Sequence, residues 1–238
     1  MPFPAIFELG ALNGANGFRI NPTTANAALG WSVASVGDIN GDGIDDLILG
    51  DPRLGPSGGG YSGAAYVVFG SDAGFPAGFD LSDLDGANGF RISGLAGAYV
   101  GVSVASAGDV NGDGFNDLII GARSDSSGVG SGGSSYVVFG GDQPFAANFS
   151  LSSINGTNGF RIDGADALDF SGHAVASAGD VNGDGVDDLI IGAYRADPNG
   201  SLGRQLRRLR LRRRSAGHPR PERPGRDQRL PDQRRRRQ

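Results

Sequence analysis

Three acidic loops of identical spacing constrain this chain more than any other feature. The sequence DINGDGIDD at residues 38–46 returns as DVNGDGFND at 109–117 and as DVNGDGVDD at 180–188. Places one, three, five and nine of each loop carry side-chain oxygen atoms, and place seven offers its backbone carbonyl. Calcium takes roughly six to eight oxygen ligands in flexible geometry, so each loop is predicted to bind calcium. Glycines at places four and six allow the positive φ angles that let the chain wrap an ion.

The predicted metal ligands occupy the same five places in all three loops. They are Asp38, Asn40, Asp42, Ile44 and Asp46; Asp109, Asn111, Asp113, Phe115 and Asp117; and Asp180, Asn182, Asp184, Val186 and Asp188. The remaining polar residues, at place eight, are expected to face solvent or a second shell rather than the ion. These are Asp45, Asn116 and Asp187.

The flanks of the loops distinguish them from EF-hands. An EF-hand needs a bidentate glutamate at place twelve and a helix on each side, whereas place twelve here is Leu49, Ile120 or Ile191. Short β-rich apolar runs bounded by glycine surround each loop, which predicts the turn of a β-hairpin. Asn-Gly and Asp-Gly are also the commonest hairpin turns without any metal. Three copies with every ligand place filled favour calcium over a plain turn.

The loops belong to a repeat of 71 residues, the spacing from Asp38 to Asp109 and from Asp109 to Asp180. Other segments follow the same series: GAAYVVFG with GSSYVVFG, and FELGALNGANGFRI with FDLSDLDGANGFRI and FSLSSINGTNGFRI. Each unit offers four strands in order, roughly WSVASV, DLILG, AAYVVF and NGFRI. Four short antiparallel strands at a fixed long period predict the blades of a β-propeller.

The units resemble FG-GAP repeats, the blades of the propeller that heads integrin α chains and recurs in bacterial surface proteins. The resemblance is carried by LGWSVASVGDINGDGIDDLILGDP with GAAYVVFG and by their counterparts in the next two units. It implies an all-β fold of four-stranded antiparallel blades, here an incomplete propeller of about three units. It also implies that the calcium hairpins share one face and that ligands bind the opposite face or its rim. No ligand motif is visible, so no ligand-contact residue is assigned.

The expected boundaries follow the repeat. Residues 1–29 form a partial unit, 30–99 and 100–169 two full units, 170–203 a truncated third unit, and 204–238 an arginine-rich tail. Propellers close with about four to eight blades, so closure as a monomer is not expected. The strand edge after DLIIGAY is expected to be open and to pair with another chain.

Charge divides the chain at residue 204. The body has six arginines and 23 acids, a net charge of −17, and the tail has fifteen arginines and three acids, a net charge of +12. An acidic body favours cations. There is no cysteine, no apolar run long enough to span a bilayer and, in MPFPAIFELG, no secretory signal pattern. We expect an extracellular or cell-surface location reached by another export route.

The tail is interpreted as a frameshifted segment rather than a basic arm for nucleic acid. CGN arginine codons read one base later encode only Gly, Ala, Val or Asp. Shifted from Gly203, the codons can encode AGSYVVFG and later NGFRI, the missing half of the third unit. The shifted Tyr and Ile span 27 residues inclusively, as do Tyr66 to Ile92 and Tyr136 to Ile162. As written, the tail is expected to be disordered because it is highly charged and poor in apolar residues.

The predicted function is non-enzymatic. His173 is the sole histidine of the body, and no HExxH motif is present. We expect a calcium-binding propeller fragment for extracellular adhesion or binding of a protein or carbohydrate ligand, with no nucleic-acid partner. The alternative is a propeller module of a larger secreted enzyme that acts on polysaccharide or lipid.

Overall fold

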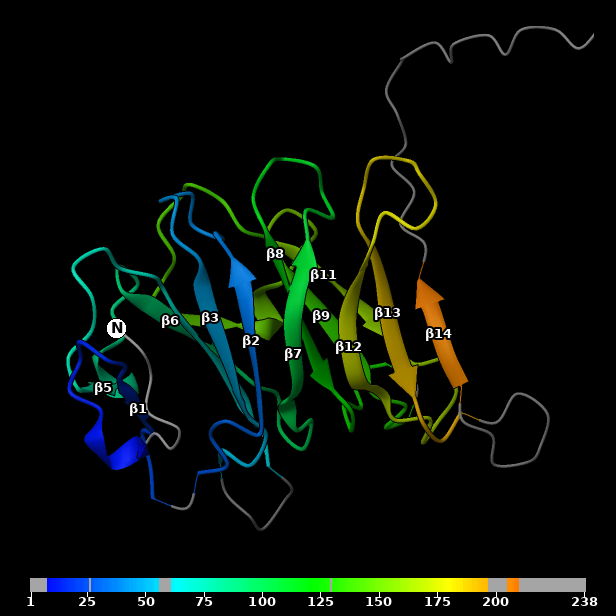
Figure 1. The fold of residues 1–238 in the computed structure, drawn as a ribbon. Helices are drawn as coiled ribbons and strands as arrows, with labels where there is room; N and C mark the ends of the chain where they lie inside the picture. The colour runs from blue at the N-terminus through cyan, green and yellow to red at the C-terminus, as the bar shows by residue number, and fades with distance from the viewer. Residues whose placement is uncertain (1–7, 26, 56–60, 129, 197–204, 210–238) are drawn as a thin grey trace, which may run out of the picture.

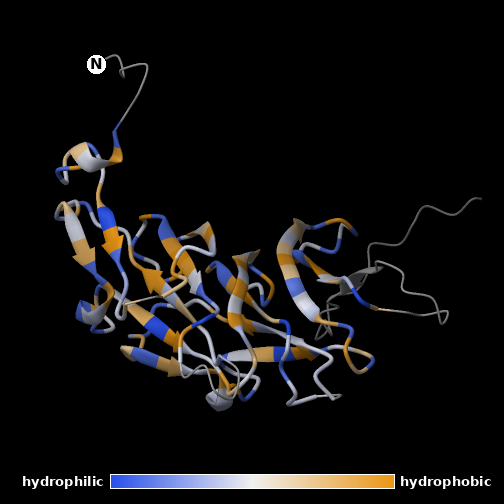
Figure 2. Cartoon of the chain, turned by 90° about the horizontal axis from the view of Figure 1, so that it is seen from below, coloured by the Kyte–Doolittle hydropathy of each residue, from blue (hydrophilic) through white to orange (hydrophobic). Residues whose placement is uncertain are grey.

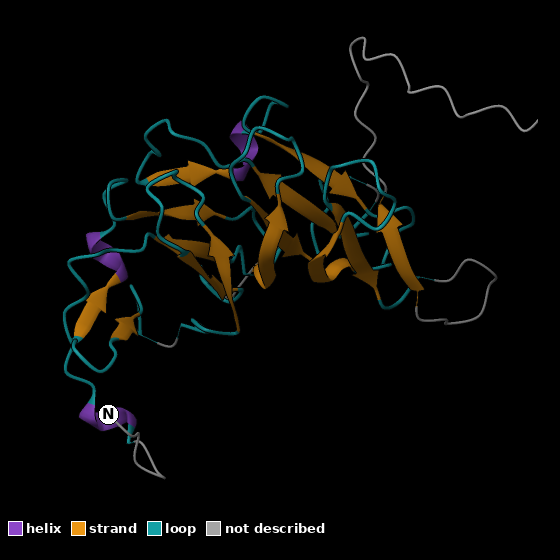
Figure 3. Cartoon of the chain, turned by 45° about the horizontal axis from the view of Figure 1, so that its top comes forward, coloured by secondary structure: helices purple, strands orange, loops and turns teal. Residues whose placement is uncertain are grey.

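The computed structural model describes residues 8–25, 27–55, 61–128, 130–196 and 205–209. Strands account for nearly all regular structure, and the helical segments are single 3-10 turns (Figure 3). These are η1 (Leu9–Ala11), η3 (Leu81–Asp83) and η4 (Leu151–Ser153). None of the helical segments in the described residues has the length and apolar character needed to cross a bilayer.

The strands form blades that stand side by side like a fan (Figure 1). The first complete blade contains β2 (Ser32–Gly37), β3 (Asp46–Asp51), β4 (Ala64–Val68) and β6 (Gly89–Ser93). The second contains β7 (Val100–Gly108), β8 (Asp117–Ala122), β9 (Ser134–Val138) and β11 (Gly159–Asp163). Neighbouring strands within each of these sets are antiparallel. The predicted all-β propeller fold is confirmed, and each of these four-strand sets matches the order expected from the sequence.

The third blade is described as three antiparallel strands, β12 (Ser171–Gly179), β13 (Asp188–Ala193) and β14 (Gln205–Leu209). The prediction of a disordered tail is wrong for residues 205–209, and residues 210–238 lie outside the described part. The edge of β13 that was expected to be open is paired with β14. The physical reason is that a strand edge offers free backbone N–H and C=O groups, which the next segment can satisfy whatever its side chains.

The register of β14 matches that of the third strand in the other blades. Ile191 faces Arg207, where Leu49 faces Tyr66 and Ile120 faces Tyr136. The shifted reading frame places a tyrosine across codons 206 and 207, at this same position of the blade. This pairing involves the backbone of the written residues, so the frameshift stays a prediction.

Each repeat also extends the blade before it, which was not expected from the sequence. β10 (Asn148–Ser150) pairs in parallel with β6 of the first blade, and β5 (Gly78–Asp80) pairs in the same way with β1 (Arg19–Asn21). A 3-10 turn then leads the chain back to the outer strand of its own blade. Consecutive repeats are thus interlocked by backbone hydrogen bonds as well as by packing.

The core lies between the blades. Strands β4, β8 and β9 are buried along their whole length, because neighbouring blades cover both of their faces. Seen from the end opposite the acidic loops, apolar positions concentrate on the strands (Figure 2). Blades approach closely: a Cβ added to Gly50 would lie 2.0 Å from the carbonyl oxygen of Gly101. A glycine at this place lets the inner strands of two blades touch.

Candidate metal loops

The three acidic loops connect the first and second strands of their blades. They link β2 to β3, β7 to β8 and β12 to β13, all at the same end of the fan, uppermost in Figure 1. The prediction that each loop is the turn of a β-hairpin is confirmed. The repeat therefore presents three equivalent acidic turns on one face.

The carboxylate at place one organises each loop through backbone N–H groups. Asp38 accepts hydrogen bonds from Gly41 (2.7 Å) and Asp42 (3.1 Å) on Oδ1 and from Gly43 (2.8 Å) on Oδ2. Asp109 and Asp180 accept from the corresponding three donors. The φ angles of Gly41 and Gly43, +79° and +86°, lie in the left-handed region and turn these N–H groups inward. The glycines are therefore required by the turn.

Places three and five are joined by the asparagine amide in two of the loops. Asn40 Nδ2 donates to Asp42 Oδ2 at 2.9 Å, and the second loop repeats this bond at 2.8 Å. In the third loop, Asn182 Nδ2 donates instead to both oxygens of Asp188, at 3.1 and 3.0 Å. The asparagine side chain thus takes different orientations in loops of nearly the same sequence.

The carboxylate at place nine is fully buried in all three loops, and in the first two it ties the loop to the end of the third strand. Asp46 accepts from Ile39 N (3.0 Å) and Gly70 N (2.8 Å), and Asp117 accepts from Val110 N and Gly140 N at 2.9 and 3.0 Å. Sequence reasoning gave these aspartates only the role of metal ligand. The structure adds an anchoring role, which the sequence could not show because Gly70 lies 24 residues away.

Burial disfavours the charged form of the carboxylates at place nine. Burial raises the pKa of Asp46 to about 6 and that of Asp117 to about 7, although their backbone N–H partners oppose this change. The negative charges of the aspartates at places one and five of the same loop raise both values further. By contrast, backbone N–H groups, chiefly that of Gly185, lower the pKa of the exposed Asp180. Each loop therefore holds like charges that repel one another in the absence of a cation.

At place eight, Asp45 is exposed as expected, and Asp187 and Asn116 contact the loop of the preceding blade, which the sequence did not predict. Asp187 Oδ2 accepts the backbone N–H of Asp109 in the preceding loop at 3.2 Å. In the second loop, the Asn116 N–H donates to the carbonyl oxygen of Asp38 at 3.3 Å. These contacts arise because blade packing brings consecutive loops together, and the spacing within one repeat carries no signal of it.

The fit of these loops to a metal rests on the chemistry of their donors. Within the described residues, no three acidic, histidine or cysteine side chains are gathered closely enough to hold a metal ion as placed. The side-chain oxygens accept N–H groups instead. The donor set still suits a hard cation, because each turn offers three carboxylates, one amide and a backbone carbonyl. The fifteen ligand assignments remain a prediction, and binding would exchange some of these hydrogen bonds for metal contacts.

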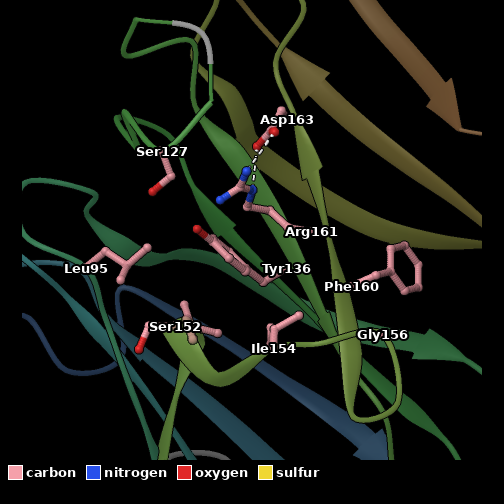
Figure 4. Close-up of a pocket in the computed structure, with 10 residues that line it drawn as sticks. Leu95, Ser127, Tyr136, Ser152, Ile154, Gly156, Phe160, Arg161 and Asp163 are labelled. Atoms are coloured by element: carbon pink, nitrogen blue, oxygen red, sulfur yellow. Dashed lines mark hydrogen bonds and ion pairs between the residues drawn. The ribbon is translucent and has the colours of Figure 1, made fainter.

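A separate cavity of about 570 Å³ lies beside the second blade (Figure 4). It is lined by Leu95 from the first repeat and by Tyr136, Ile154, Arg161 and Asp163 from the second. Arg161 and Asp163 are paired at 2.8 Å. Its two charged groups satisfy each other, and polar and apolar groups line the cavity in about equal measure.

The family model of the FG-GAP repeat matches residues 29–68, 100–138 and 171–204, the segments that hold the three loops and their flanking strands. This chain is an FG-GAP repeat protein. All fifteen predicted ligand places fall within the three matched FG-GAP segments. The resemblance identified from the sequence motifs is thereby confirmed.

The curated relatives of this FG-GAP protein include proteins of two kinds. Phosphatidylinositol-glycan-specific phospholipase D from Rattus norvegicus is 36% identical over 175 residues, which cover 69% of this chain and 18% of the relative. Integrin alpha-V from Gallus gallus is 32% identical over 170 residues, with 69% and 14% coverage. Integrin alpha-6 from Gallus gallus is 26% identical over 168 residues, with 70% and 13% coverage. The FG-GAP chain thus spans less than a fifth of the length of these relatives.

Proposed function

We propose that this FG-GAP chain is a non-catalytic propeller module whose three acidic loops bind calcium and which binds a ligand outside the cell. The observation that carries the calcium part is the threefold recurrence of the same oxygen donor set on one face of the fan. A second support is electrostatic, since burial and, to a smaller extent, the charges of Asp42 and Asp38 raise the pKa of Asp46. A bound cation would relieve that repulsion.

Calcium would be held by the fifteen predicted residues, and its role would be structural. When bound, it supplies positive charge that offsets the clustered carboxylates. In the first two loops, the aspartate at place nine also binds the end of the third strand, so calcium would stabilise the blade as well as the loop. Extracellular calcium modules often bind at ~10⁻⁴ to 10⁻³ M. At a tenfold excess over the dissociation constant, each site would add about 1.4 kcal/mol to the free energy of unfolding.

Thermal unfolding tests the calcium proposal. The melting temperature of the chain should rise by several degrees in millimolar calcium relative to chelator, because each of the three proposed sites would add to a small free energy of unfolding. Asp42→Ala should reduce this rise by removing one ligand. The matched control is Asp83→Ala, which removes an exposed carboxylate outside the loops. A melting temperature that does not respond to calcium would exclude the structural role.

The ligand-binding part of the proposal draws on the integrin relatives, and the expected partner is an extracellular protein or carbohydrate. Integrin alpha-V and integrin alpha-6 each align with more than two thirds of this chain. The body's net charge of −17 and its lack of cysteine fit a domain that relies on cations rather than disulfides for stability. A location outside the cell, where calcium is plentiful, is therefore proposed together with the calcium sites.

A second candidate function is a propeller module within a larger enzyme that acts on lipid or polysaccharide. It is favoured by the 36% identity to a phosphatidylinositol-glycan-specific phospholipase D. Sequencing the DNA through codons 195–238 and beyond distinguishes the two candidates. A single-base correction that restores YVVFG and NGFRI would establish the frameshift. A catalytic domain in the restored frame would favour the enzyme module, and further repeats would favour the adhesion module.

A further inference from the structure

Six residues form an aromatic–arginine cluster across the second and third blades, at the end opposite the acidic loops. Tyr99 and Phe170 directly precede β7 and β12, Arg123 follows β8, Tyr194 and Arg195 follow β13, and His173 lies near the start of β12. The first strand of each blade ends at its acidic loop, and the second strand begins at that loop. Residues at the start of the first strand and after the end of the second strand therefore share the opposite face. Figure 2 is viewed toward this face.

The members of the cluster contact one another in two groups, one at each blade. The Arg123 guanidinium lies 5.1 Å from the centre of the Tyr99 ring. His173 lies 4.5 Å from Tyr194 between ring centres, and Tyr194 stacks on Phe170 at 5.6 Å. A Cβ added to Gly121 at the end of β8 would lie 1.9 Å from the carbonyl oxygen of Gly172 in β12, and this close approach brings Arg123 beside the third blade.

The second arginine, Arg195, contacts two rings of the third-blade group. The Arg195 guanidinium lies 4.7 Å from the Phe170 ring and 5.6 Å from the Tyr194 ring. His173, Tyr194 and Arg195 are exposed, and the other members of the cluster are half-buried. The two groups thus lie on adjacent blades at one face, and neither blade could form the cluster alone.

The arginines of the cluster lack acidic partners in a strongly acidic domain. Within the part of the chain that the structure describes, neither Arg123 nor Arg195 forms an ion pair, whereas Arg161 pairs with Asp163. The Arg123 Nε atom is buried and has no hydrogen-bond partner there. An arginine that stacks flat on a ring keeps the N–H groups at its edge available for a carboxylate.

The backbone at this surface is strained at two equivalent places. Tyr99 and Phe170 have φ angles of +56° and +53°, in the left-handed region that bulky residues rarely enter. Such conformations are unfavourable for bulky residues and cluster at functional sites. Here it holds the two rings on which the arginines rest.

We propose that the aromatic–arginine cluster is a docking surface for a protein partner that presents aspartate or glutamate side chains. This inference rests on the proposed ligand-binding function and supplies its surface and chemistry. Tyrosine, phenylalanine and arginine are the residues enriched at the centres of protein interfaces, where acidic residues are depleted. The two arginines supply the charge complementarity, and the rings supply rigid apolar area.

The test is fluorescence anisotropy with a labelled peptide of alternating glutamate and glycine, at fixed calcium concentration. The intact chain should bind this peptide and should not bind the corresponding lysine–glycine peptide. Arg195→Glu should weaken binding by about tenfold or more, because a charged hydrogen bond becomes a repulsion. The matched control Arg19→Glu makes the same charge change at an exposed residue of β1 and should leave binding within about twofold.

Three results would overturn the proposal. They are no binding of the glutamate peptide, an equal loss in the Arg195 and Arg19 variants, or binding of polygalacturonate in place of the peptide, which would indicate an acidic glycan. Melting the same samples with calcium and with chelator separates this proposal from the calcium proposal. A calcium response that persists in Arg195→Glu shows that the variant is folded. Peptide binding without any calcium response would refute the calcium role alone.

Discussion

Leu151→Ala tests whether consecutive repeats are interlocked. Leu151 belongs to the second repeat, in the 3-10 turn that follows β10, and its side chain is only 3% exposed. It packs in the same core cluster as Phe90 and Ile92, which lie on β6 of the first blade. Truncating it should therefore destabilise the first blade although the change lies in the second repeat.

The magnitude follows from the burial of Leu151. Removing a buried leucine side chain costs about 2–5 kcal/mol, from lost burial and from the cavity that remains. For a chain of this size, each kcal/mol lowers the melting temperature by about 2–4 °C, so a decrease of about 4–20 °C is expected. The matched control is Val137→Ala, because Val137 is in the same repeat and is fully buried, but it packs in the cluster that joins the second and third blades.

Amide hydrogen exchange measured strand by strand is the deciding assay. Leu151→Ala should reduce protection in β6, and Val137→Ala should reduce it in β9 and β13 while β6 keeps most of its protection. If Leu151→Ala left β6 as protected as in the parent chain and weakened only β11, the interlocking argument would be refuted.

Two further predictions concern buried polar contacts. Tyr136→Phe removes a hydroxyl that donates to Asp125, and it should cost about 1.5–3 kcal/mol above pH 5. Burial raises the pKa of Asp125, but hydrogen bonds from Ser127 and Tyr136 outweigh it and leave the pKa below its ordinary value. The free energy that this hydrogen bond contributes is present above the pKa of Asp125 in the unfolded chain and is lost as pH falls through its pKa in the folded chain. The difference in stability between Tyr136→Phe and the parent chain should therefore shrink in acid unfolding titrations. Tyr66→Phe, which removes a bond to a neutral hydroxyl, is the control and should show no such pH dependence. Asp187→Ala should weaken calcium binding by the second loop in calorimetric titration, since it removes an acceptor for that loop's backbone. Asp45→Ala should leave the second loop unchanged, and equal effects of the two variants would contradict coupling between loops.

The candidate metal loops show which features can be predicted from residues that are neighbours in the sequence. The hairpin turns, the glycines and the first carboxylate were predictable because their contacts lie within six residues. The anchoring role of Asp46 was not, because its partner Gly70 follows a different strand. The contact between Asp187 and Asp109 spans 78 residues and depends on how the blades pack.

The amino-acid sequence by itself determined the repeat, its four strands and the composition of the loops, because strand periodicity and turn chemistry act over a few neighbouring residues. The tertiary structure alone decided three other features. It placed β5 and β10 on the preceding blade, linked the loops through place eight, and assembled the aromatic–arginine cluster from two repeats. Each of these features joins residues of different repeats, and their proximity exists only once the blades have packed.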